Sequence, residues 1–196
     1  MNNQPGPNAP HAGFDNNIDA NGSGVLPIAS ANTIAALKAA ITGAPDETPT
    51  TIALTTNITF TVASNYITIP ANKIITLTSN MEAQDAPFAI DAAELNRVIS
   101  ILANGELTLE NITVTGGKTT GSTTTSDGGG IRNLGTLTLD GGTTVSGNTS
   151  NTSGGGIQNL GGGTIIMNAG AVISGNTVNA NQGLRKPKKR DKQRNI

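Results

Sequence analysis

An internal repeat in the second half of the chain limits its possible folds more than any other feature. The segment GGGIRNLG at 128–135 recurs 26 residues later as GGGIQNLG at 154–161. Two further blocks follow in the same order and recur 28 residues later: 137–140 as 165–168, and 145–149 as 173–177. A weaker copy precedes them at 107–110 and 114–117. Three aligned blocks in one order do not arise easily by chance, so the chain repeats one structural unit.

Each repeat unit contains three short apolar patches separated by glycine, and none contains a helical segment. Three short strands per unit make one turn of a three-sided parallel β-helix, and the missing helix argues against a leucine-rich repeat. Successive turns stack about 4.8 Å apart, which is the interstrand spacing of a sheet. Equivalent residues then form ladders. The predicted inward ladders are Leu107/Leu137/Ile165, Leu109/Leu139/Met167 and Val114/Val145/Ile173, with Asn148 and Asn176 stacked at a corner.

The composition agrees with a narrow solenoid. Aromatic residues make up 2% of the chain, and tryptophan and cysteine are absent, so the core must be built from Ile, Leu and Val in a thin space. The lack of cysteine excludes disulfides and cysteine-ligated metal sites. The predicted fold class is therefore all-β: a right-handed, single-stranded parallel β-helix with a short N-terminal capping helix and about five to seven coils.

The first half of the chain shows one helix followed by strands. Residues 33–42 are predicted to form an amphipathic helix with Asn32 as N-cap, and such a helix would cover the first coil. Its apolar face is Ile34, Leu37 and Ile41, and Gly43 and Pro45 end it. Alternating apolar residues then predict strands at Ile52/Leu54, Ile58/Phe60/Val62, Ile67/Ile69 and Ile75/Leu77. An irregular loop is expected over 81–96, and a strand at 98–102.

Composition divides the chain into a flexible N-terminal segment at 1–27, the β-helix at 28–180, and a basic disordered tail at 181–196. Residues 185–194 contain seven Lys/Arg and one acid, whereas 1–184 contain five Lys/Arg and twelve acids. Such a tail can bind nucleic acid or an anionic surface. However, this tail begins where the repeat predicts the next Gly-Gly-Gly-Ile block. A truncated repeat array explains it better, and we do not favour nucleic acid as a partner.

The last coil, which contains Ile173 and Asn176, has no successor in the sequence. It is expected to expose strand edges and apolar side chains, which promotes end-to-end self-association. No apolar run approaches the roughly 20 residues that cross a bilayer, so no membrane span is predicted. The first residues of the chain lack the basic and apolar regions of a signal peptide.

The repeats resemble those of bacterial polymorphic outer-membrane proteins and autotransporter adhesins. Those repeats pair a Gly-Gly-Ala/Leu/Val-Ile tetrapeptide with Phe-x-x-Asn. Here Gly-Gly-Gly-Ile stands at 128–131 and 154–157, and an aliphatic residue replaces Phe at 145–148 and 173–176. The helix followed by strands at 33–79 is similar to pectin-lyase-like β-helix regions of bacterial surface proteins. The resemblance, whose specific motifs cover 128–177, implies adhesion, surface display or a passenger stalk, and hence a secreted or cell-surface location.

An enzymatic alternative arises because pectate lyases and polygalacturonases share this fold. Glu110, Asp140 and Asn168 occupy the same slot after their strands, so they are expected to stack on neighbouring coils. Two carboxylates roughly 5 Å apart have the separation of a retaining glycosidase pair. No basic residue accompanies them, since the nearby ones belong to other segments: Arg97, Lys118 and Arg132. A solvated corner is the simpler interpretation.

Three other features have plain structural explanations. His11 stands alone in the N-terminal segment, and Asp15–Gly22 resembles a calcium loop but lacks the downstream acid. Four threonines are predicted to point outward and could form a flat array: Thr108, Thr136, Thr138 and Thr143. The array is interrupted at Ile166 and Ala171. We therefore assign no catalytic, cofactor-binding or metal-binding residue.

The sequence as a whole predicts a non-enzymatic, secreted or cell-surface, adhesin-like β-helix module. Its partner, whether a host surface, a glycan or a protein ligand, is not specified by any motif. The alternative function is a β-helix polysaccharide lyase or glycoside hydrolase that acts on acidic polysaccharide. A third is a phage-type fibre segment, which would trimerise.

Overall fold

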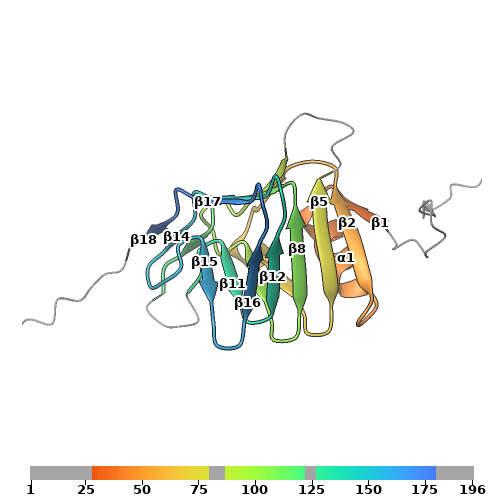
Figure 1. Cartoon of the computed structure of the whole chain (residues 1–196). Coiled ribbons are helices and arrows are strands. Elements are labelled where there is room, and N and C mark those ends of the chain that lie inside the picture. The colour runs from red at the N-terminus through yellow and green to blue at the C-terminus, as the bar shows by residue number, and fades with distance from the viewer. Residues whose placement is uncertain (1–27, 80–86, 122–126, 180–196) are drawn as a thin grey trace, which may run out of the picture.

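The structure is a computed structural model that describes residues 28–79, 87–121 and 127–179. Over these ranges parallel sheets stack into a β-solenoid of about four turns, with 9% helix (Figure 1). The predicted parallel β-helix is thus confirmed. The expected five to seven coils are too many, because the helix occupies the first coil and the coil that begins at β5 is longer than the repeat. For example, Leu77 lies opposite Leu109 in the next coil. The predicted segments 1–27 and 181–196, with His11 and Asp15–Gly22, lie outside the described residues.

Four sheets, which we name A to D, run along the solenoid. Sheet A contains β1 (Ile28–Ala31), β2 (Pro49–Leu54), β5 (Ile74–Ser79), β8 (Glu106–Glu110), β12 (Thr136–Leu139) and β16 (Thr164–Met167). Sheet B contains β3 (Ile58–Thr59), β6 (Phe88–Asp91), β9 (Ile112–Thr115), β13 (Thr144–Ser146) and β17 (Val172–Ser174). Sheet C contains β4 (Ile67–Ile69), β7 (Ile99–Ile101), β11 (Ile131–Asn133) and β15 (Ile157–Asn159). Sheet D contains β10 (Lys118–Thr119), β14 (Thr149–Ser150) and β18 (Thr177–Val178).

A complete coil runs from sheet A to B to C and returns to A one strand further along, as β5, β6, β7 and β8 do. All neighbouring strands are parallel. The later coils add a short strand of sheet D between B and C. The three predicted sides are therefore present. Sheet D was not predicted, because its two-residue strands are mostly polar and carry no apolar pattern.

The interior is a stack of aliphatic ladders. All three ladders predicted from the repeat are present in register: Leu107/Leu137/Ile165, Leu109/Leu139/Met167 and Val114/Val145/Ile173. Leu137 and Leu139 are fully buried, and Thr138 between them is half-buried on the outward side. Burying one such aliphatic side chain stabilises the fold by about 1.5–3 kcal/mol. The ladders therefore supply the main stabilisation along the length of the solenoid.

Stacked asparagines form a polar ladder at the corner after β13. The side-chain amide of the fully buried Asn148 donates to the backbone oxygen of Val114 at 3.1 Å and to Oδ1 of Asn176 at 3.0 Å. Its own Oδ1 accepts from the backbone N–H of Gly117 at 2.8 Å. The predicted stacking is thus confirmed. The left-handed residue at this corner is the preceding Gly147, with φ +66°, and not the asparagine.

The helix α1 (Ile34–Gly43) stands between β1 and β2, where the later coils have their strands of sheets B and C. Leu37 and Ile41 are fully buried and join the solenoid core, and Ile34 packs against it. The N-cap is Thr33, whose Oγ1 accepts from the backbone N–H of Ala36 at 3.1 Å, so the prediction of Asn32 was wrong by one residue. The predicted amphipathic helix is confirmed, and as part of the first coil it covers the core of the coil that follows.

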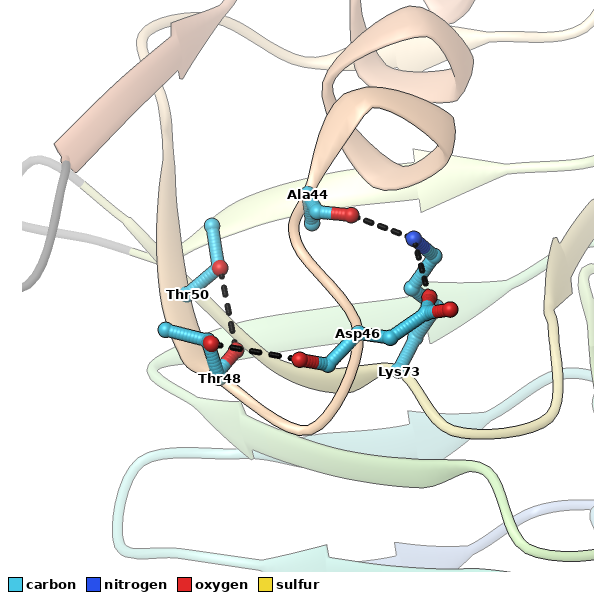
Figure 2. Close-up of polar contacts among 5 residues, drawn as sticks. All are labelled: Ala44, Asp46, Thr48, Thr50 and Lys73. Atoms are coloured by element: carbon cyan, nitrogen blue, oxygen red, sulfur yellow. Dashed lines mark hydrogen bonds and ion pairs between the residues drawn. The ribbon is translucent and has the colours of Figure 1, made fainter.

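A lysine from the following coil fastens the turn after α1 (Figure 2). Lys73 Nζ donates to the backbone oxygen of Ala44 and lies 2.7 Å from Oδ1 of Asp46. Thr48 Oγ1 donates to the backbone oxygen of Asp46 at 3.2 Å, and Thr50 repeats this pattern with Thr48 at 3.2 Å. The turn between α1 and β2 is thus tied to the solenoid by a cation and by its own hydroxyls.

Two local predictions are wrong. The segment predicted to be an irregular loop at 81–96 contains β6, whose Phe88 and Ile90 are buried in the core. Val62 was expected to point inward, but it is 51% exposed. It precedes the 3₁₀ turn η1 (Ala63–Asn65), where the chain leaves the strand geometry, so the alternation no longer fixes its direction.

Candidate functional site

Sheet C carries a polar row on its outer face. Thr68, Ser100, Arg132 and Gln158 lie opposite one another on β4, β7, β11 and β15. Because residues alternate along a strand, this row faces away from the buried isoleucines of β4 and β7. The hydrogen-bonding register therefore places one arginine in line with two hydroxyls and an amide.

A second arginine reaches this face from the turn before β7. Arg97 is only 8% exposed. Its backbone N–H donates to Oδ1 of Asn96 at 2.7 Å, and Nδ2 of Asn96 donates to the backbone oxygen of Ala63 at 3.0 Å. These bonds fasten the turn to the neighbouring coil. The position of Arg97 is thus set by the backbone on which it stands.

The two arginines lie close enough to influence each other's charge. Burial lowers the pKa of Arg97 below its ordinary value, and the positive charge of Arg132 lowers it further. Tyr66 and Asp127 act in the opposite direction. Asp127 is itself buried, and its Oδ1 accepts from Oγ of Ser153 at 2.9 Å. A second positive charge beside Arg97 is an unfavourable arrangement that an added anion would relieve.

Arg132 also has an unsatisfied donor. Its Nε is buried and has no hydrogen-bond partner among the described residues. Leaving a buried donor unsatisfied costs about 1–3 kcal/mol, and more for a charged group. This donor is therefore a candidate point of contact for a group from outside the chain.

The arginines line a solvent-open groove of about 490 Å³. Its walls are Tyr66, Thr68, Asn96, Arg97, Ser100, Leu102 and Arg132. A second hollow of about 260 Å³ shares Asn96 and Arg97 and extends to Lys118. The Tyr66 ring lies 5.9 Å from Nζ of Lys38, within reach of a cation–π contact. Together these hollows make an elongated basic groove.

The charge of the described residues is unevenly distributed around the solenoid. They contain five Lys/Arg residues: Lys38, Lys73, Arg97, Lys118 and Arg132. Two of these line the larger hollow, Lys118 lines the smaller one, and Lys38 lies against Tyr66. Only Lys73 is engaged elsewhere, in the turn after α1. No carboxylate lines either hollow, so the lining itself is positive. The acids near it are Asp127, which acts on Arg97, and Glu94, which pairs with Lys118.

The carboxylates singled out in the sequence lie elsewhere, at the ends of β8 and β12 in sheet A. Nδ2 of Asn168 donates to Oδ1 of Asp140, and Glu110 is exposed. Asp140 and Asn168 therefore touch on neighbouring coils as predicted, at a solvated corner. In the described part of the chain, no group of three or more His, Cys, Asp or Glu residues could hold a metal ion.

The threonine array is less regular than expected. Thr76, Thr108 and Thr138 stack on the outer face of sheet A, and Ile166 interrupts the row at β16, as predicted. Thr143 was predicted to face outward, but it is fully buried, and its Oγ1 donates to the backbone oxygen of Leu109 at 2.8 Å. Thr143 follows the turn after β12, where strand alternation does not apply.

The sequence alone does not bring Arg97, Lys118 and Arg132 together. They stand on different segments, and only the stacking of coils makes them neighbours. One signal was available: Arg132 occupies the x of Ile-x-Asn-Leu, an outward position, where the next repeat has Gln158. Arg97 has no counterpart in the repeat, and its placement follows from the turn before β7.

No protein-family model, curated protein or solved structure matches this chain. The fold defines the class, a parallel β-solenoid, and the basic groove is its best candidate site. The resemblance to polymorphic outer-membrane proteins and autotransporter adhesins remains an expectation from the sequence. No helix in the described ranges is long and apolar enough to cross a membrane.

Proposed function

We propose that this chain is a non-enzymatic, adhesin-like β-helix module, secreted or displayed at a cell surface, that binds its ligand on the outer face of sheet C. The observation that carries the proposal is the groove containing Arg97 and Arg132. It combines positive charge, an unsatisfied buried donor and an open hollow. Its lining includes no pair of carboxylates for acid–base chemistry.

The scaffold suits a binding role. Ser100 and Arg132 stand on β7 and β11, which are hydrogen-bonded on both sides, and Thr68 stands on the edge strand β4, which pairs with β7. Side chains on such rigid elements are held more accurately than those on loops, and a prearranged site loses less entropy on binding. The arrangement therefore favours recognition by a fixed surface.

The test is whether the chain retains a ligand without cleaving it. The purified chain, coupled to beads, is challenged with a panel of host-cell glycans and matrix proteins, and the same panel is assayed for cleavage with and without calcium. Retention of at least one class without cleavage supports the module. Absence of any retention, or turnover of the retained ligand, contradicts it. Fractionation of the source cells tests the surface location.

The second candidate is a lyase or hydrolase that acts on acidic polysaccharide. One observation bears on it: polar side chains of neighbouring coils meet at the ends of the sheet A strands, where Nδ2 of Asn168 donates to Oδ1 of Asp140. Turnover that Arg97→Lys abolishes would establish this function at the groove. Turnover abolished by Glu110→Gln with Asp140→Asn would place it at the carboxylate corner instead.

A further inference from the structure

The geometry points to an anionic oligosaccharide as the ligand of the sheet C groove, with a carboxylate or sulfate ester held between Arg97 and Arg132. This inference rests on the proposed function, since it names the ligand class for the same surface. The shared chemistry is a singly charged oxyanion attached to a sugar ring. Each part of the groove contributes one element of that recognition.

The arginine pair selects the oxyanion. A guanidinium offers planar, forked donors that match the oxygens of a carboxylate or sulfate, and bonds of this kind are stronger than neutral ones. Nε of Arg132 is already buried without a partner, so binding satisfies a donor that the fold leaves unsatisfied. An anion placed here also offsets the repulsion between the two arginines.

The rest of the lining selects a saccharide. Thr68 and Ser100 place short hydroxyl groups in the lining, of the kind that bond sugar hydroxyls. Tyr66 lines the groove and is 38% exposed, so part of its ring is open to contact with a sugar. An acidic peptide fits less well. Extended peptides bind by adding a strand to a sheet edge, whereas Ser100 and Arg132 of this groove stand on β7 and β11, whose backbones are hydrogen-bonded on both sides.

The shape of the groove favours an oligomer over a single sugar. The two hollows share Asn96 and Arg97, and the second one reaches Lys118, which forms a 2.7 Å ion pair with the exposed Glu94. An exposed pair of this kind contributes little to stability and exchanges easily for a ligand anion. A chain with anionic groups on successive residues would contact Arg132, Arg97 and Lys118 in order.

The experiment uses the single tyrosine of the chain as the reporter. Tyr66 is the only tyrosine and there is no tryptophan, so intrinsic fluorescence comes from the groove itself. The full chain is titrated with oligogalacturonate, which carries carboxylates, and with dextran sulfate, which carries sulfate esters. Neutral dextran and poly-glutamate are the comparison probes, and calorimetry repeats each titration. We expect at least one anionic saccharide to bind, with an affinity that falls as salt increases.

Arg132→Gln is the key variant, because the next coil carries Gln158 at the same position in the register. It should weaken binding of the anionic saccharide by about ten- to a hundredfold, the loss expected for charge-assisted hydrogen bonds. Thermal unfolding should be unchanged or slightly improved, since the substitution removes an unsatisfied buried donor. Thr138→Glu makes the same change in net charge on the outer face of sheet A, and should leave the affinity within about twofold.

The outcomes distinguish a wrong ligand class from a wrong proposed function. Binding of oligogalacturonate alone identifies the carboxylate, and binding of dextran sulfate alone identifies the sulfate ester. The inference is overturned if neither binds, if neutral dextran or poly-glutamate binds as tightly, or if Arg132→Gln binds like the parent. If the bead panel still retains a ligand in that last case, the binding module stands and only its ligand class is wrong. If the panel retains nothing, the module itself is rejected.

Discussion

The coil that begins with β12 and the coil that begins with β16 repeat one sequence pattern in one register, yet they differ completely in burial. Leu139 is 0% exposed, whereas Met167, which lies opposite it, is 51% exposed. Val145 and Ile173 show the same contrast, at 0% and 42%. These side chains are similarly apolar. Burial in this fold is therefore conferred by the coil that stacks on top, and only indirectly by the sequence of the coil itself.

The comparison implies a gradient of stability along the solenoid. Each coil contacts mainly its neighbours, so the total stability is a sum of coil and interface contributions. The coils of β8 and β12 are covered on both sides, whereas β16, β17 and β18 (blue in Figure 1) contact the solenoid on one side within the described residues. Changes at matched positions in the two coils should therefore have unequal effects.

The largest expected effect is at the inner ladder of sheet A. Leu139→Asp places an unpaired charge in the closed core and should lower the free energy of unfolding by more than about 4 kcal/mol. Met167→Asp makes the same change in register, where the charge keeps contact with water, and should cost about 1 kcal/mol or less. Urea unfolding followed by circular dichroism measures both. Equal losses would mean that the last coil is covered after all.

A smaller effect is expected at the asparagine corner. Asn148→Ala removes the side chain that bonds Val114, Gly117 and Asn176, leaving buried backbone groups unsatisfied. It should cost about 2–4 kcal/mol. Asn176→Ala, in the last coil, loses its bond to the backbone oxygen of Val145 at 2.8 Å and the two bonds that its Oδ1 accepts from Asn148. Because Asn176 is only half-buried, water can replace part of these bonds, and the variant should cost about 1–2 kcal/mol. The same urea experiment applies, and a larger loss for Asn176→Ala would contradict the gradient.

Much of this contrast was predictable from the repeat. The aligned blocks fixed which residues stack, because a strand register follows once two copies of a coil are superimposed, and Leu137, Leu139 and Asn148 are where the repeat placed them. The pattern failed where the chain leaves strand geometry, as at Val62 and Thr143. It also failed at β6, whose coil has no close copy in the sequence.

The candidate site was less predictable for a physical reason. A groove on the outer face depends on which side chains become neighbours across coils and from turns outside the repeat. Arg132 lies within the repeat, and its outward direction follows from alternation. Arg97 stands in an irregular turn, so its approach to Arg132 could be learned only from the structure.

Hydrogen exchange offers a finer measurement of the gradient. Backbone amides of β17, such as Val172 bonded to Thr143, should exchange with an opening free energy about 1–2 kcal/mol lower than those of β13. The exposed apolar side chains of the last coil also favour stacking of a second copy end to end. In that case protection of β17 would rise with protein concentration, more so at high salt, and light scattering would rise in parallel. Protection of β17 equal to that of β13 in a strict monomer would contradict the gradient.

The smallest effect is expected at the polar corner that joins the two coils. Asn168 of the last coil donates to Asp140, so Asp140→Asn with Glu110→Gln exchanges charged acceptors for neutral ones without changing shape. Exposed groups of this kind contribute little, because water competes for the same hydrogen bonds and salt screens the charges. The double variant should therefore unfold within about 0.5 kcal/mol of the parent, and exchange in β17 should be unchanged. If the variant instead loses protection in β17 alone, the last coil is held by this polar contact more than by the aliphatic ladder. The gradient would then come from the corner rather than from the exposure of Met167 and Ile173.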